Sequence, residues 1–313
     1  MMTTNETKMN GFLLVGFSEN HNLQILQACL FLVMYLLALT SNFIIITITT
    51  LDEHLQSPMY YFLKQLSLLD LSFISVTVPQ SIGNSLTDNG YISYAQCMLQ
   101  VFFFTSLAWA EVAILTVMSY DHYVAICFPL HYELIMDARR CKSAVTAVWV
   151  SGSITGTLYM AGTCSITFCR AKVIHHFFCD VPQIVKLSCS NDYLAVIGVD
   201  SLMAVAALAC FISIVLSYIH IFSTVLRIPS AEGRSKVFST CLPHLFVVSF
   251  FLSTGMCAYF KPTSDSPTAF DLFLSIFYTV IPPTLNPVIY SLRNEAMKRA
   301  IQKVMLDREF TEK

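Results

Sequence analysis

The sequence predicts an all-α membrane protein, a bundle of seven transmembrane helices followed by a short amphipathic helix near the C-terminus. The chain has 313 residues, of which 55% are apolar and only 12% are charged, whereas a soluble domain carries about 25% charged residues. Five stretches contain no Asp, Glu, Lys or Arg over roughly 20 residues or more, the length that crosses a hydrocarbon core as a helix. Two further apolar segments with a few acidic residues complete the set of seven spans.

The intervening segments are short, which predicts a single domain over residues 1–313. Its expected parts are a polar tail at 1–22, spans at about 23–50, 58–81, 94–127, 141–162, 196–226, 237–260 and 270–292, and a C-terminal segment at 293–313. In that segment apolar residues recur at helical spacing and basic residues surround them, which predicts a helix lying on the membrane surface. The apolar set is Met297, Ala300, Ile301, Val304 and Met305, and the basic set is Lys298, Arg299 and Lys303.

Basic residues are distributed unevenly between the two sides of the predicted membrane. The loops near 128–142 and 227–236 and the C-terminal segment together carry twelve of the 18 Lys and Arg residues, and the other side carries five. The positive-inside rule therefore predicts a cytoplasmic C-terminus and an extracellular N-terminus. With this orientation Asn5-Glu6-Thr7 is an N-glycosylation motif on the correct side of the membrane.

Four of the eleven cysteines, Cys97, Cys169, Cys179 and Cys189, fall on the outer side of this topology, where disulfides form. Four cysteines allow three pairings, and the spacing does not choose among them. His175-His176 precede Cys179, but a sulfur in a disulfide is not a thiolate ligand, which disfavours a metal site there. The other seven cysteines are expected to be reduced.

Two acidic residues, Asp70 and Glu111, lie inside predicted spans, where a charge costs roughly 2.5–3.5 kcal/mol on insertion scales. In one interpretation each accepts hydrogen bonds from neighbouring Ser, Asn or Tyr groups. In the other they join Asn42 and Asn286 in a central polar cluster that holds a cation or a shared proton, because neighbouring carboxylates repel each other.

Catalysis is not expected. An intramembrane aspartyl protease needs two carboxylates that share a proton, whereas Asp200 and Asp271 are expected at the outer ends of spans, near the lipid headgroups. The chain contains no HExxH, GxSxG or phosphate-binding motif. The sequence therefore predicts neither an enzyme nor a nucleic-acid partner.

Two motifs close the third and the seventh spans. Asp121-His122-Tyr123 ends the third, and Asn286-Pro287-Val288-Ile289-Tyr290 ends the seventh. Together they resemble the cytoplasmic ends of helices three and seven in rhodopsin-like G-protein-coupled receptors. The wording MSYDHYVAICFPLHY at 118–132, with the runs at 57–63 and 236–245, resembles the olfactory receptor branch of that class.

This resemblance implies a receptor in the plasma membrane, surrounded by lipid. A small volatile odorant would bind it and shift it toward a state that activates a stimulatory G protein and raises cAMP. The resemblance also implies the disulfides Cys97–Cys179 and Cys169–Cys189 and a sodium ion beside Asp70. No other cofactor and no oligomeric state are inferred.

The ligand cavity implied by the resemblance lies in the outer half of the bundle, among spans three, five, six and seven. The positions carried over are mostly apolar and include no acidic or basic side chain, so we expect an alcohol, ketone, ester or terpenoid rather than an amine or carboxylate. They are Phe104, Thr105, Ala108, Trp109, Leu202, Met203, Ala206, Leu252, Gly255, Tyr259, Ile276 and Thr279.

The residues implied in activation and G-protein coupling lie at the inner side. They are Asp121, His122, Tyr123, Tyr218, His244, Asn286, Pro287 and Tyr290. His122 stands where the family has arginine, and an imidazole lacks the bidentate fork of a guanidinium. Alternatives are therefore a receptor that couples weakly or not at all and, with less support because no internal repeat is evident, a helical-bundle transporter or channel.

Overall fold

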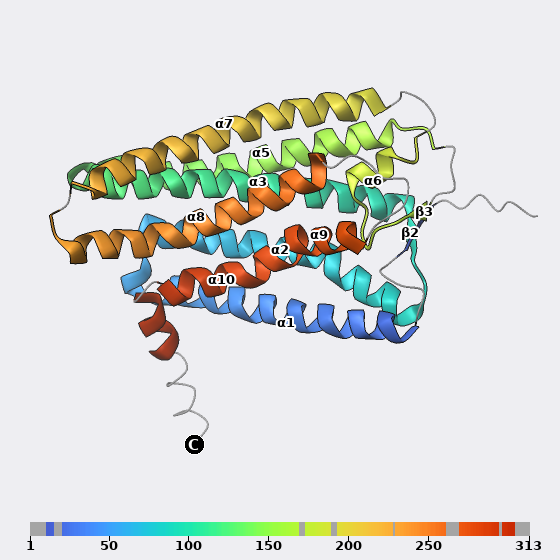
Figure 1. The fold of residues 1–313 in the computed structure, drawn as a ribbon, viewed down its shortest axis with the longest axis horizontal. Helices are drawn as coiled ribbons and strands as arrows, with labels where there is room; N and C mark the ends of the chain where they lie inside the picture. The colour runs from blue at the N-terminus through green and yellow to red at the C-terminus, as the bar shows by residue number, and fades with distance from the viewer. Residues whose placement is uncertain are drawn as a thin grey trace, which may run out of the picture.

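The long helices run alongside one another in the computed structural model (Figure 1). It describes residues 11–15, 21–168, 173–188, 193–227, 229–260, 269–293 and 296–303. The helices of the bundle are α1 (His21–Leu51), α2 (Pro58–Thr87), α3 (Tyr94–Cys127), α5 (Ala138–Cys164), α7 (Leu194–Val225), α8 (Ala231–Phe260), α9 (Ala269–Thr279) and α10 (Ile281–Arg293). Short elements connect them: η1 (Glu53–Leu55), η2 (Pro129–His131), α4 (Tyr132–Ile135) and α6 (Val181–Val185).

Five of the described helices, namely α1, α2, α3, α7 and α8, are long and apolar enough to cross a membrane. The pair α9 and α10 passes the same test as one bent span. The helix α5 is richer in Ser, Thr and Gly and falls short on hydropathy, but its 27 residues extend over about 40 Å and pack along α3. With α9 and α10 taken as one bent segment, the described bundle therefore has seven long helical segments, and all except α5 are strongly apolar.

The last span is broken rather than continuous. Its two halves meet at an angle of 47° between Thr279 and Ile281. Pro282 and Pro283 follow the break and explain it, because proline lacks the N–H of the helical hydrogen bond and disfavours helical backbone in the residue before it.

The helix α3 lies at the centre of the bundle, in contact with α2, α5, α7 and α8. Its start is held by a capping box in which Ser93 accepts from the backbone of Gln96 and the Gln96 side chain accepts from the backbone of Ser93. The contact with α5 depends on glycine. A Cβ added to Gly156 would lie 2.5 Å from the backbone oxygen of Phe102 and would overlap Ser106 Oγ.

A small sheet covers the outer end of the bundle, in the order β2-β1-β3. Its strands are β1 (Gly11–Leu14), β2 (Tyr91–Ser93) and β3 (Val173–Ile174). The register pairs Phe12 with Ile92 in the antiparallel β1–β2 pair and Leu14 with Ile174 in the parallel β1–β3 pair. The sequence interpretation contained no strands, and this sheet ties the N-terminal segment to two outer loops.

The helix boundaries differ from the expected spans mainly in α2, which continues to Thr87, and in α8, which starts at Ala231. Both extensions are more polar than the membrane core requires, so hydropathy missed them. Residues 296–303 are helical, with Met297 and Ala300 buried against the bundle and Arg299 exposed. Val304 and Met305 lie outside the described residues.

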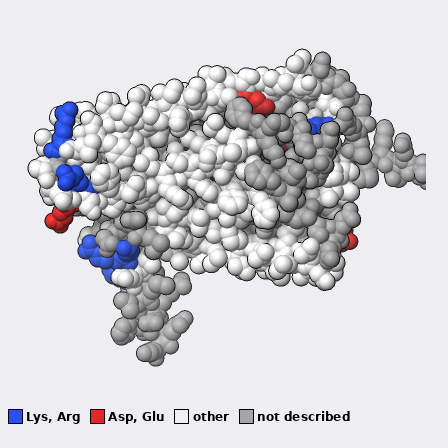
Figure 2. All heavy atoms as spheres, in the orientation of Figure 1, with Lys and Arg blue, Asp and Glu red and all other residues white. Residues whose placement is uncertain are grey.

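The surface of the bundle is apolar, as is typical of a protein surrounded by lipid. Many large apolar side chains on α1 and α7 are exposed, such as Leu30, Leu202 and Val205, and water would not stabilise such a surface. On the face shown in Figure 2, Lys and Arg gather mainly at the end of the bundle where the α7–α8 connection and the C-terminal helix lie.

Candidate functional site

A cavity of about 400 Å³ lies in the outer half of the bundle. It is lined by α3, α5, α7 and α8, with one residue each from α2 and α9, Phe73 and Tyr278. Its volume is at the lower end of the usual range of about 300–1,000 Å³ for small-molecule sites.

Seven of the twelve positions expected to contact the ligand line this cavity. They come from three helices: Phe104, Thr105, Ala108 and Trp109 from α3, Met203 from α7, and Leu252 and Gly255 from α8. The Thr105 hydroxyl donates to Val101 O at 2.8 Å within its own helix, so its oxygen still has acceptor capacity for a ligand.

Four expected positions do not line the cavity, and Leu202 is the clearest error. It is 57% exposed on the outer face of α7, because the cavity face of this helix contains positions 200, 203, 204 and 207, which share one side of a helix. Ala206 also lies off that face. Ile276 packs against the core, and Thr279 is buried, with its hydroxyl bonded to Ser275 O. The side chain of Tyr259 lies outside the described part of the structure.

The expectation of a cavity without charged groups is wrong. Asp200 of α7 lines the cavity beside Tyr159 of α5, and the Tyr159 hydroxyl donates to Asp200 Oδ1 at 2.7 Å. The sequence interpretation placed Asp200 among lipid headgroups, because hydropathy gives depth along a helix but not the direction in which a side chain points. It also missed α5 as a wall, although Thr155 and Tyr159 contribute to it.

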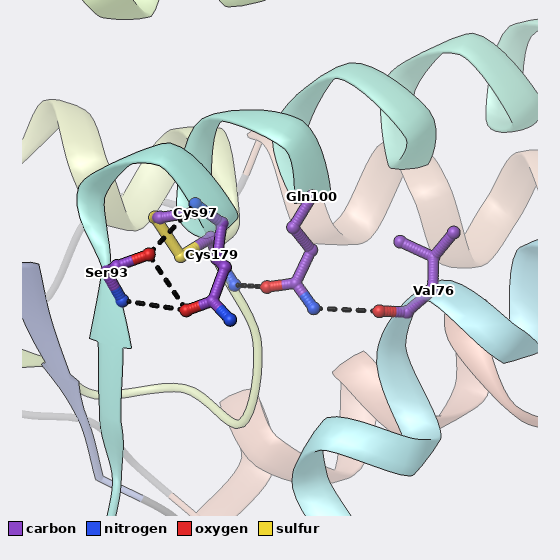
Figure 3. The surroundings of a disulfide bond; sticks show 6 residues. Val76, Ser93, Cys97, Gln100 and Cys179 are labelled. Atoms are coloured by element: carbon purple, nitrogen blue, oxygen red, sulfur yellow. Dashed lines mark hydrogen bonds between the residues drawn. A yellow bond between two sulfur atoms is a disulfide. The ribbon is translucent and has the colours of Figure 1, made fainter.

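The outer loop that contains Cys179 is attached to α3 by a disulfide between Cys97 and Cys179, the pairing that the resemblance implied. Gln100, one turn further along α3, adds two hydrogen bonds (Figure 3). Its side-chain oxygen accepts from the backbone N–H of Cys179 at 2.8 Å, and its amide nitrogen donates to Val76 O of α2 at 2.8 Å. The loop is thus held to α3 covalently and to α2 through Gln100.

Next to this disulfide, a buried carboxyl group connects the loop to the last span. Asp180 Oδ2 accepts a hydrogen bond of 2.9 Å from Tyr278, the residue of α9 that lines the cavity. Burial raises the pKa of Asp180 to about 6, and the hydrogen bond from Tyr278 offsets part of this rise. His176 packs edge-on against Phe178 in the same loop.

Two sequence predictions concern residues outside the described part of the chain. Cys169 and Cys189 are not described, although the residues just before them, Phe168 and Ser188, form an antiparallel bridge. Asn5 lies in the N-terminal segment that is also not described.

In the middle of the bundle three of the four residues of the expected polar cluster come together. Asn286 of α10 donates to both oxygens of Asp70, at 3.1 and 3.2 Å, and its side chain also faces Glu111. Glu111 is 1% exposed, and its Oε1 has no hydrogen-bond partner among the described residues. Asn42 donates instead to the backbone oxygens of Ala38 and Pro283, at 2.9 and 2.8 Å.

Toward the inner end, α3, α7 and α8 are joined by a row of three hydrogen bonds. His244 Nε2 lies 3.0 Å from Leu115 O, Tyr218 OH lies 2.8 Å from His244 Nδ1, and His122 Nδ1 lies 3.3 Å from Tyr218 OH. A carbonyl oxygen only accepts, so His244 Nε2 donates to it, and Nδ1 of a neutral ring then accepts from Tyr218. The tyrosine oxygen is left to accept from His122, so one proton on each ring satisfies the whole row, hereafter the inner relay.

The other residues expected to act in activation lie in α3 and α10. Asp121 does not pair with its neighbour His122 but accepts a 2.8 Å hydrogen bond from Tyr132 of α4. Tyr123 packs against Phe128 and His220. Pro287 lies within α10, and the buried hydroxyl of Tyr290 has no hydrogen-bond partner among the described residues.

Comparisons with known proteins agree with this architecture. A family model described as "Olfactory receptor" matches residues 31–308. Human Olfactory receptor 14J1 is 63% identical over 309 residues, which cover 99% of this chain and 96% of that protein. Human Olfactory receptor 14A16 is 52% identical, over 95% of this chain and 96% of its own length.

A solved structure supports the fold independently of sequence. The crystal structure of squid rhodopsin matches with a TM-score of 0.70 at 17% identity, over 92% of this chain and 87% of that one. Identity at this level concerns the fold alone. The seven-helix architecture predicted from the sequence is therefore confirmed.

Proposed function

Because the chain belongs to the olfactory receptor family, we propose that it binds a small, mostly apolar volatile in the outer cavity and activates a stimulatory G protein, raising cAMP. Members of this family are receptors of the plasma membrane that cross it several times, and they are not enzymes. The observation that carries the proposal is the cavity itself, whose lining is mainly aromatic and aliphatic and lies between α3, α7 and α8.

Those three helices also carry the inner relay, and this supports a coupling between ligand and G protein. A ligand shifts the receptor only to the extent that it binds one conformation better than another. His122, Tyr218 and His244 lie on these same helices, so we expect a volatile that changes the spacing of α3, α7 and α8 at the cavity to change the distances among these three side chains as well.

The orientation belongs to the same proposal. The N-terminus is placed outside and the C-terminus in the cytoplasm, because Lys and Arg favour the cytoplasmic side. The surface at the inner end supports this arrangement, since basic side chains gather there on the visible face (Figure 2). The G protein would then meet the end at which Asp121, His122 and Tyr123 lie.

A sodium ion is proposed for the central cluster. Asp70 and Glu111 are both buried, and their oxygens, with that of Asn286, are the hard ligands that such a cation prefers. The partnerless Oε1 of Glu111 supports a ligand there, and a shared proton is the alternative. If sodium binds, sodium chloride should raise the unfolding temperature of the wild type but not that of Asp70→Asn. Choline chloride at equal ionic strength is the control and should raise the unfolding temperature of neither protein.

A receptor with weak coupling is the second candidate, and a specific observation favours it. His122 is bonded to Tyr218 and offers no guanidinium to a G protein. Replacing it by arginine in His122→Arg should raise the agonist-evoked cAMP response if the histidine limits coupling. Equal basal and evoked cAMP in the two proteins would show that the position is neutral.

The cavity is tested by filling it. Gly255 lines the cavity and has open space around the position of a Cβ, so Gly255→Leu should occupy ligand volume without a clash. In cells that contain an olfactory-type G protein, the variant should raise the agonist concentration for half-maximal cAMP roughly tenfold or more, about 1.4 kcal/mol. The matched control is Gly83→Leu on α2, where space is also open. Unchanged responses of Gly255→Leu at equal surface expression would place the ligand elsewhere.

A further inference from the structure

Asp200 is the one carboxylic acid among the eighteen described residues that line the outer cavity, and none of them is Lys, Arg or His. It lies on the inward face of α7 with Met203, Ala204 and Ala207, positions that share one side of a helix. The side chain is half-buried. A carboxylate in this position carries charge into a largely apolar compartment at considerable cost unless something compensates it.

The described part of the protein compensates this carboxylate only in part. Tyr159 donates one hydrogen bond to Oδ1 at 2.7 Å, which fixes the orientation of the group. Oδ2 accepts no hydrogen bond from the described residues, and no described Lys, Arg or His forms an ion pair with Asp200. Asp180, the next acid, is close enough to interact electrostatically with Asp200, which adds negative rather than positive potential.

The rest of the lining is suited to a cation with an apolar body. Six aromatic residues face the cavity, namely Phe73, Phe104, Trp109, Tyr159, Phe251 and Tyr278. The faces of such rings attract cations, and the same rings bury hydrocarbon favourably. A carboxylate ligand would instead be repelled by Asp200.

We propose that Asp200, held by Tyr159, is an ammonium-binding subsite, and that the preferred ligand of the cavity is a protonated alkylamine or arylalkylamine. The ammonium group donates to Asp200 Oδ2, and the hydrocarbon part lies among the aromatic residues. A neutral alcohol can also donate to Asp200, but its hydrogen bond lacks the second charge and is about half as strong. This inference rests on the proposed function and narrows it to one class of ligand.

The test compares amines with alcohols of the same shape. Hexylamine and 1-hexanol, and 2-phenylethylamine and 2-phenylethanol, are titrated against the purified full-length receptor in lipid nanodiscs, with thermal unfolding as the readout of binding. Each amine should bind roughly 10- to 100-fold more tightly than its alcohol. The reason is that the hydrogen bond from an ammonium group to a carboxylate is about twice as strong as the one from a neutral hydroxyl group. Equal binding within a pair, or binding of the alcohol alone, overturns the proposal.

Variants separate the charge of Asp200 from its structural role. Asp200→Asn still offers Tyr159 an acceptor but has no charge, so it should remove the preference for amines and leave the binding of the alcohols nearly unchanged. Tyr159→Phe should weaken amine binding by a smaller factor. The control is Asp88→Asn, which removes an outer acid away from the cavity, and in which asparagine tolerates the left-handed backbone of φ 49°. An amine preference that persists in Asp200→Asn overturns the proposal.

The two proposals fail in different ways. If amines stabilise the receptor but evoke no cAMP, the ligand class stands and the coupling is wrong. If alcohols bind and signal while amines do not, the receptor function stands and the ammonium subsite is wrong.

Discussion

The outer and inner halves of the bundle use the same three helices in opposite ways. In the outer half α3, α7 and α8 leave a cavity of about 400 Å³. In the inner half they are joined by the relay from His122 through Tyr218 to His244. In the proposed function, the ligand occupies the empty space of the outer half, and the hydrogen bonds of the inner half are the contacts that its binding would change.

The free energy of one hydrogen bond in the relay is comparable to the difference in ligand affinity between two conformations of the receptor. A net contribution of about 0.5–1.5 kcal/mol is typical of one hydrogen bond, which is within the differential affinity that a small ligand can supply. The contrast therefore predicts that the outer half is sensitive to changes in volume and closure, whereas the inner half is sensitive to the loss of single polar atoms.

The largest effect is expected where the outer half is closed. Cys97→Ser removes the bond between α3 and the loop that contains Cys179 and should lower the free energy of unfolding by about 2–5 kcal/mol. Thermal unfolding in detergent and the amount of receptor at the cell surface measure this. Cys29→Ser on α1, where the cysteine is free and exposed, is the control. Equal losses in both would mean that the disulfide has no special role.

The next effect concerns the wall between α3 and α5. Gly156→Ala places a methyl group against Phe102 O and Ser106 Oγ, and overpacking of this kind costs about 1–3 kcal/mol. Because the helices must separate near the cavity, ligand affinity should fall together with the unfolding temperature. Gly198→Ala on α7, where the added methyl meets nothing within 4 Å, should be neutral. A stable Gly156→Ala protein would show that this contact adapts easily.

In the inner half a single oxygen is the target. Tyr218→Phe removes the hydroxyl that links His122 and His244 and leaves both rings without that partner, at a cost of about 1–2 kcal/mol. Basal cAMP should change several-fold while ligand affinity stays near the wild-type value. Ser217→Ala is the control, because the Ser217 hydroxyl bonds to Ser213 O of its own helix and takes no part in the relay. Basal signalling equal to the wild type in Tyr218→Phe would remove the relay from the mechanism.

The smallest effect is a pH dependence at Asp180, in the outer loop that bonds to Tyr278. The pKa of Asp180 is raised to about 6 by burial, above its ordinary value, so the folded state favours the protonated acid. The stability contributed by this group therefore rises as the pH falls from 7 to 5, by about 1 kcal/mol. Asp180→Asn should lack this part of the pH dependence of thermal unfolding, whereas the exposed acid variant Glu133→Gln should retain it. Identical pH profiles for the wild type and Asp180→Asn would contradict the raised pKa.

Much of the architecture follows from the order of residues, because lipid imposes a simple rule on them. A span must be long, apolar and helical so that its backbone bonds are satisfied internally, and hydropathy reads this rule directly. It also accounts for the exposed leucines of α1 and α7. The motifs around Asp121 and Asn286 led to the family for a different reason. They are recognised by the specific order of several residue types and not by hydropathy alone.

The direction of side chains could be anticipated only where a motif specified it. On α3, the expected positions Phe104, Thr105, Ala108 and Trp109 all line the cavity. On α7, which is apolar on all sides, no amphipathic pattern marks an inward face, and Leu202 was assigned to the wrong side.

The chain alone thus determined the seven-helix fold class and the family to which it belongs, because these depend on composition and on local runs of residues. Only the tertiary structure decided that Asp200 points into the cavity beside Tyr159, that Asp121 bonds to Tyr132 rather than His122, and that a small sheet closes the outer end. Each of these three features brings together residues from different helices, strands or loops. The rotation of each helix about its own axis brings them together, and that rotation is set by packing against neighbouring helices.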